Sequence, residues 1–159
     1  MPTTDQLEAI AEHIKYEVDE FRKSIRDLTR LRPGDTAWNR TLESALLHFR
    51  ILRTFFFDER RYTDDISARH YIEEWQPTKD NVFDETKEAL DKRLAHLTLD
   101  RLKPPEKWPL GRMNAAIERL VLNFKRSLAQ SQADWFSRLE AQTVITSGTE
   151  ASNRTDSAS

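Results

Sequence analysis

The stretch from Thr36 to Phe57 carries apolar side chains around most of its circumference when it is wound as a helix at about 100° per residue. The apolar positions are Leu42, Ala45, Leu46, Phe49, Ile51, Leu52, Phe55 and Phe56. Only a strip around Glu43, Arg50 and Thr54 is plainly polar. Because a helix of this kind needs other elements to cover it, the sequence predicts that it is the most buried helix of an all-α protein.

An apolar stripe with steps of three and four residues precedes this segment. It predicts a first helix over residues 5–30, which ends before Pro33 and Gly34. Asp35 or Thr36 can then cap the second helix, which we expect over residues 36–57.

Further stripes follow the second helix. A short helix is expected from Thr63 or Asp64 to Trp75, because Pro77 follows it. Another stripe predicts a helix over residues 81–102, and Pro109 suits the first turn of a last helix that reaches about residue 139.

Four long helices with short connections predict an antiparallel four-helix bundle, with one short extra helix between the second and third. We expect a single domain over residues 1–140. Residues 141–159 are rich in Ser and Thr and are expected to form a disordered tail, because they hold too little apolar surface to offset the entropy of ordering.

Composition narrows the classes of function. Charged residues make up 33% of the 159 residues, with 3 Gly and 6 Pro, which favours solvated helices over a turn-rich β-sandwich. The formal net charge of −2 supplies no global positive field, so DNA binding is not predicted. The chain has no cysteine, which fits a reducing compartment. No export leader and no membrane-length apolar run occurs, so we expect a soluble, cytoplasmic protein.

His48 lies within the apolar surface of the second helix, at the helical angle of Ile51, Leu52 and Phe55. An unpaired buried polar group costs about 1–3 kcal/mol, so at least one ring nitrogen needs a partner. One interpretation is a core histidine bonded to a carboxylate or hydroxyl on a facing helix. The other is a general base or metal ligand in a dry pocket.

Glu43 and Arg50 lie two helical turns apart on the polar strip, with Cα atoms roughly 10 Å apart at a rise of about 1.5 Å per residue. They are too far apart to pair directly. We therefore expect each to pair with a residue on another helix, or Glu43 to face solvent.

Polar residues also gather in two later segments. His96 shares a helical flank with Arg93 and Asp100, which is either a solvated face or a binding site. Asp64 and Asp65 stand at the start of the expected short helix, where acidic residues favour the positive end of the helix dipole. His70 lies in the same short helix.

A metal site is a third interpretation of these histidines. His48, His70 and His96, with Glu43 or Asp65, supply nitrogen and oxygen ligands of the kind that zinc, iron or manganese binds. The chain has no HExxH motif and no Glu-x-x-His pair, which argues against such a site. No metal and no other cofactor is predicted.

Ordered blocks of the sequence resemble a group of helical bacterial proteins of unknown function, over residues 37–124. The blocks are "ESALLHFRILRTFF", "DD" followed by "A..HY" and a Trp, and "LAHLTLDR" ahead of "KW". The resemblance implies these characteristic positions: Glu43, His48, Arg50, Asp64, Asp65, Ala95, His96 and Thr98. Where the pattern has an asparagine-lysine pair ahead of the Ala-His, this chain has Asp91 and Lys92.

The expected layout is also similar to the HEPN class, whose nuclease members cut RNA with an arginine and a histidine spaced as R-x(4–6)-H. None of the 4 histidines follows an arginine at that spacing, and Arg93 stands too close to His96. The resemblance is therefore one of architecture. It implies a non-catalytic or differently built member, since a fold does not by itself give a function.

These patterns favour an interaction or small-ligand binding module, with a protein partner or a second copy as its partner. Its buried polar cluster would hold Glu43, His48, Arg50 and His96, and Asp64, Asp65 and His70 are further binding candidates. The first alternative is a HEPN-like ribonuclease or defence toxin, the one case in which RNA is expected. His48 or His96 would then act as acid and base, and Arg50 or Arg101 would stabilise the phosphate. The second alternative is a metal-binding bundle, and whether the chain is an enzyme stays open.

Overall fold

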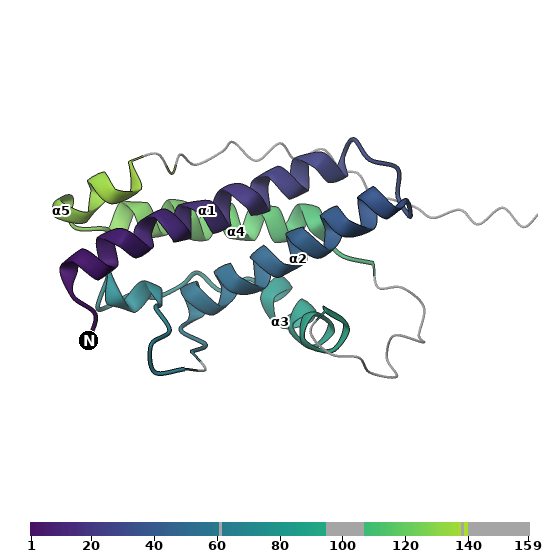
Figure 1. Ribbon diagram of the computed structural model, residues 1–159. Coiled ribbons are helices and arrows are strands. Elements are labelled where there is room, and N and C mark those ends of the chain that lie inside the picture. The colour runs from purple at the N-terminus through teal and green to yellow at the C-terminus, as the bar shows by residue number, and fades with distance from the viewer. Residues whose placement is uncertain (61, 95–106, 138, 140–159) are drawn as a thin grey trace, which may run out of the picture.

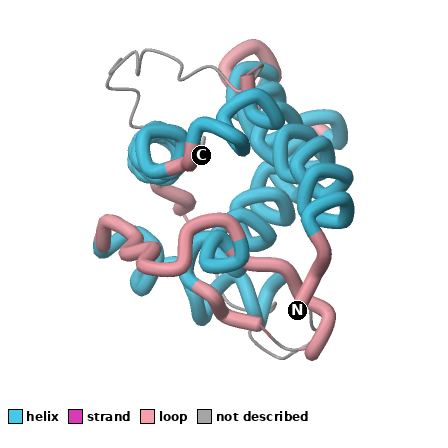
Figure 2. Tube along the Cα trace, turned by 90° about the vertical axis from the view of Figure 1, so that its left-hand side faces the viewer, coloured by secondary structure: helices cyan, strands magenta, loops and turns pink. Residues whose placement is uncertain are grey.

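The computed structural model describes residues 1–60, 62–94, 107–137 and 139 (Figure 1). Within these residues every regular element is helical and no strand occurs, as Figure 2 also shows. The all-α class predicted from the sequence is confirmed. No helix in the described part of the chain is long and apolar enough to cross a membrane.

The first two helices, α1 (Thr4–Leu28) and α2 (Thr36–Phe57), form an antiparallel hairpin (Figure 1). Thr3 and Gln6 cap the start of α1 through reciprocal side-chain and backbone hydrogen bonds. Gly34 adopts a φ of 89° in the connection, a conformation that glycine adopts without strain. The bounds of α2 are those expected from the sequence, and α1 ends two residues before the expected position.

Two further helices pack against this hairpin, the first beside its second helix and the other along both of its helices. These are α3 (Asn81–Ala89), which continues into the π-helical turn η2 (Leu90–Leu94), and α4 (Leu110–Ser127). The ring of Phe49 in α2 stacks on Phe83 of α3 at 5.3 Å between centroids. Phe124 of α4 lies at the centre of an aromatic cluster with Phe55, Phe56, Tyr71, Trp75 and Phe136. The core therefore lies where α1, α2, α3 and α4 face one another.

The prediction of a short helix over residues 64–75 is wrong. Only the 3-10 turn η1 (Ala68–His70) forms there. Two buried aromatic side chains hold the segment to different helices instead: the Tyr71 hydroxyl donates to the Leu7 carbonyl at 2.8 Å, and the Trp75 indole donates to the Phe56 carbonyl at 2.7 Å. These anchors give the segment partners outside itself, so it does not depend on helical hydrogen bonds.

The last helix is shorter than expected. It ends at Ser127, because Leu128 adopts an extended conformation with φ −66° and ψ 141°. Two short turns follow, α5 (Gln130–Ala133) and η4 (Asp134–Phe136), which bring the Phe136 ring within 5.2 Å of Phe124. A straight helix rises about 1.5 Å per residue and would have carried Phe136 away from the core.

Two expectations fall on residues that the structure does not describe. These are the continuation of the third helix beyond residue 94 to residue 102 and the disordered tail over residues 141–159.

Candidate functional site

Three candidate residues of α2 face three different directions. His48 contacts α1, Arg50 contacts the turn after α3, and Glu43 is exposed to solvent. Their separation follows from the helical turn of about 100° per residue, which spreads positions 43, 48 and 50 around the axis. The expectation that Glu43 belongs to a buried cluster with His48 is wrong, whereas the expectation that Glu43 faces solvent is confirmed.

His48 is 8% exposed and its Nδ1 lies 2.6 Å from Oε2 of Glu17 on α1. The predicted bond to a carboxylate on a facing helix is therefore confirmed. Because a carboxylate only accepts, Nδ1 carries the hydrogen, and Nε2 of a neutral ring is an acceptor. The edge of the imidazole also meets the ring of Tyr16, with 6.0 Å between centroids. The Glu17–His48 contact thus fixes how α1 packs on α2. We call the line of contact between these two helices the seam.

Arg50 forms an ion pair with Asp91 of the π-helical turn, with 3.1 Å between Nε and Oδ1. The pairing of Arg50 with a residue of another element is confirmed. Both side chains are partly exposed, and such pairs contribute at most about 1 kcal/mol.

Asp64, Asp65 and His70 lie in the loop before and within η1. Asp64 is exposed, and Oδ2 of Asp65 accepts a hydrogen bond from the Tyr62 N–H at 3.0 Å. Nδ1 of His70 accepts from the Ser67 N–H at 3.0 Å. The expected role of the two aspartates at a helix start is wrong, since no α-helix begins there, and Asp65 and His70 close turns of the loop.

The remaining candidates, His96 and Arg101, lie outside the described residues, as do Ala95 and Thr98. Across the described ranges, no group of three or more His, Cys, Asp or Glu side chains is arranged to hold a metal ion.

A buried ion pair that the sequence reasoning missed joins α1 to α4. Nε and Nη2 of Arg22 each donate to an oxygen of Glu118 at 2.7 Å, and both side chains are 4% exposed. Arg22 follows Val18 by four residues, on the buried face of α1. A charged residue on the buried face of the helix was the feature of the sequence that could have revealed this ion pair. The fork geometry fixes how α4 lies on α1.

The end of α2 carries a residue with left-handed backbone, Asp58, at φ 57°. Burial alone would raise the pKa of its carboxyl group. The Ser67 hydroxyl and the Arg60 guanidinium outweigh that effect and lower the pKa below its ordinary value of 3.8. Arg60 Nε lies 2.5 Å from this carboxylate. Asp58 therefore helps to hold the loop that follows α2.

Glu59, the next residue, connects α2 to α3. It accepts hydrogen bonds from the buried Arg53 at 3.1 and 2.5 Å and from Lys87 at 2.9 Å. Burial alone would raise the pKa of Glu59, but the bonds from Lys87 and Arg53 lower it below the ordinary 4.5. This cluster stabilises the packing of α3 on α2.

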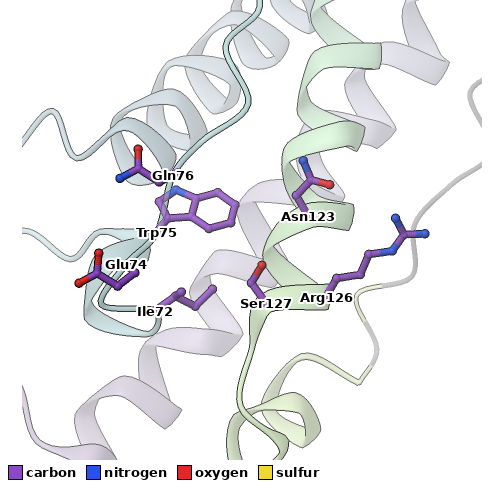
Figure 3. A pocket seen from close by; sticks show the side chains of 7 residues that line it. All are labelled: Ile72, Glu74, Trp75, Gln76, Asn123, Arg126 and Ser127. Carbon is purple, nitrogen blue, oxygen red and sulfur yellow. The ribbon is translucent and has the colours of Figure 1, made fainter.

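A surface hollow of about 310 Å³ lies between the loop before α3 and the end of α4 (Figure 3). It is lined by Ile72, Glu74, Trp75, Gln76, Asn123, Arg126 and Ser127. Figure 3 shows the charged ends of Glu74 and Arg126 on opposite sides of the hollow. The polar groups therefore do not converge on a common point, as a small-ligand site requires.

Large apolar side chains are exposed on the outer side of the α1–α2 hairpin. Tyr16 is 56% exposed, Leu47 45% and Ile51 39%. Leu47 and Ile51 are one turn apart on α2 and flank His48, whose ring contacts Tyr16. We call the surface formed by Tyr16, Leu47, His48 and Ile51 the hairpin face.

Comparisons of the chain with protein-family models, with curated proteins and with solved structures gave no match.

Proposed function

We propose that the protein is a cytoplasmic helical interaction module that binds a protein partner through the hairpin face. The observation that carries this proposal is the exposure of Tyr16, Leu47 and Ile51 on adjoining turns of two helices. Contiguous apolar surface on a soluble protein marks an interaction site more often than scattered apolar residues do. The open hollow beside Trp75 lacks converging polar groups, so a protein partner is favoured over a small ligand.

The Glu17–His48 bond supports this role because it makes the face rigid. The bond and the Tyr16–His48 ring contact hold the seam of the two helices in one geometry. A surface that is ordered before binding loses less conformational entropy when a partner docks.

We further propose that α1, α2, α3 with its π-helical turn, and α4 form an antiparallel four-helix arrangement. The antiparallel α1–α2 hairpin, the Phe49–Phe83 stacking and the Arg22–Glu118 pair support it. In this arrangement α2 is covered on its inner side, and no described helix covers the hairpin face.

Photo-crosslinking tests the proposed function. A photoreactive phenylalanine at Leu47 is expected to give discrete protein adducts in the cells that naturally express the chain. The same group at Tyr62, which is 71% exposed and outside the hairpin face, is the matched control. The partner identified from the adducts is then expected to bind the purified chain and to lose affinity for Leu47→Arg but not for Tyr62→Arg. Equal adducts from both positions, or none, would refute the proposal.

The Glu17–His48 contact favours a second candidate, acid–base chemistry in an RNA-cleaving enzyme. A carboxylate behind Nδ1 fixes the tautomer and leaves Nε2 to exchange a proton. Against it, Arg50 is paired with Asp91 and points away from His48. Incubation of the purified chain with labelled single-stranded RNA tests this candidate: cleavage that His48→Asn abolishes supports it, and intact RNA rejects it.

A further inference from the structure

We infer that the partner of the hairpin face is a second copy of this chain, with α1 of one copy packed antiparallel on α2 of the other. This inference rests on the proposed function and names its partner. It is carried by matching apolar and charged positions along the outer sides of α1 and α2.

The contacts within one hairpin fix which residues of α1 and α2 lie at the same level. Glu17 contacts His48, and Ser24 contacts Ser44 at 3.1 Å. Residue numbers rise along α1 as they fall along α2. Continuing this register places Lys23 level with Glu43 to within about one helical turn of 3.6 residues.

The same register places two further pairs of positions at common levels. Asp27 lies level with Arg40, and Tyr16 lies level with the segment between Leu47 and Ile51.

These residues lie on the outer sides of their helices. On α1, Tyr16, Lys23 and Asp27 are separated by seven and four residues, a spacing that keeps them on one face. On α2, Arg40, Glu43, Leu47 and Ile51 form the equivalent outer stripe. Except for Asp27, which is half-buried, all these side chains are exposed.

A two-fold axis parallel to the helices, placed over the seam, keeps every residue at its level and exchanges α1 with α2 across the interface. Tyr16 of one copy then meets Leu47 and Ile51 of the other. Lys23 meets Glu43, and each contact occurs twice.

The third matched position joins opposite charges as well, since Asp27 meets Arg40. Among the described residues, Arg40 and Glu43 have no ion pair within their own chain, so both are available to the second copy. Lys23 lies 3.6 Å from Glu20 of its own chain, a partly exposed pair that Lys23 can exchange for Glu43 of the second copy. The apolar centre and two flanking charge pairs are thus complementary to a second copy. Such pairs set the orientation of an interface more than its strength.

Charge reversal tests the partner and its register together. Sedimentation equilibrium of the full chain is expected to show a dimer. Lys23→Glu and Glu43→Lys are each expected to weaken dimerisation about tenfold, because each change replaces attraction by repulsion at two symmetric positions. The double variant Lys23→Glu/Glu43→Lys restores the attraction and is expected to recover most of the affinity. Tyr62→Arg is the control and leaves the dimer unchanged.

The absence of cysteine from the chain allows a second, independent measurement. A mixture of the Asp27→Cys chain with the Arg40→Cys chain is expected to form a disulfide-linked dimer under mild oxidation. Either chain alone, or Asp27→Cys mixed with Tyr62→Cys, is expected to form much less.

A chain that stays monomeric at all concentrations overturns this inference. A dimer in which the charge-reversed double variant is weaker than both single variants overturns it as well. If the chain is monomeric and a group at Leu47 still crosslinks a different protein, the proposed function stands and the second copy is rejected. If the chain is monomeric and gives no adduct, both fail.

Discussion

Glu118→Leu is expected to be among the most destabilising single substitutions of a charged residue in this protein. The change removes both acceptors of the Arg22 guanidinium, whose side chain is 4% exposed. Within the described part of the chain, the other acidic side chain near Arg22 is Asp19, which lies 3.8 Å from Nη1 and is itself largely exposed. Arg22 would then be a buried charge with little compensation.

Removal of one partner of a buried ion pair costs about 3–5 kcal/mol. The whole free energy of unfolding of a domain is about 5–15 kcal/mol, so this loss is a large fraction of it. For a chain of this length each kcal/mol shifts the melting temperature by about 2–4 °C, which predicts a decrease of roughly 6–20 °C.

Urea denaturation followed by far-UV circular dichroism measures the effect. The double variant Arg22→Met/Glu118→Leu removes both charges and is expected to be more stable than Glu118→Leu alone, because the buried Arg22 guanidinium is no longer present without its carboxylate. The matched control is Glu85→Leu, which breaks the exposed pair of Arg112 and Glu85, also bonded through two nitrogens at 2.8 and 3.1 Å. Exposed pairs contribute at most about 1 kcal/mol.

Equal small losses for Glu118→Leu and Glu85→Leu would refute the reasoning, because burial would then make no difference to an ion pair of the same geometry. A double variant as unstable as Glu118→Leu alone would refute it too. In that case the loss of stability would come from altered packing and not from the Arg22 guanidinium that lost its carboxylate.

Three further predictions follow from the described contacts. His48→Ala leaves Glu17 without its partner and is expected to lower the free energy of unfolding by about 1–3 kcal/mol, measured by urea denaturation. An unchanged denaturation midpoint would contradict the stabilising role of the Glu17–His48 contact. Because the pKa values of Asp58 and Glu59 are lowered on folding, their stabilisation is complete above their ordinary values of 3.8 and 4.5 and is lost as the pH falls through the lower folded values. Thermal melts from pH 7 to pH 2 should show this loss, and Asp58→Asn/Glu59→Gln should flatten the curve below about pH 4. Phe124→Ala should lower the free energy of unfolding by about 3–5 kcal/mol. A loss below about 1 kcal/mol would show that Phe124 is not central to the packing of the core.

The sequence predicted α2 well because the signal is local. An apolar surface around most of a helix requires burial wherever the other helices lie. The same reasoning placed His48 in a buried position and required a polar partner for it, which the structure supplies as Glu17. Which residue supplied that partner depends on the register of α1 and α2, which periodicity does not determine.

The errors occurred where long-range contacts override the local pattern. The apolar spacing around Leu128 continues the helical stripe, but burial of Phe136 against Phe124 requires the chain to turn there. Tyr71 and Trp75 likewise find hydrogen-bond acceptors on α1 and α2, so the expected short helix is reduced to the turn η1.

The candidate site shows the same division. The sequence identified the polar side chains of α2, and it predicted that Arg50 pairs with another element and that Glu43 either does so or faces solvent. Glu43, His48 and Arg50 were expected in one cluster because they are close in the sequence, but their different angles on the helix direct them to different neighbours. The exposure of Leu47 and Ile51 was missed, because an apolar residue on a helix gives no sign of whether a neighbour covers it.

The turn at Leu128 has a practical consequence for shortened versions of the protein. Phe136 and Leu139 are fully covered by the rest of the fold, and Phe136 closes one side of the aromatic cluster around Phe124. A chain trimmed where α4 ends would open that cluster to water and invite aggregation. Residues up to Leu139 therefore belong in any fragment that is meant to stay folded and dispersed.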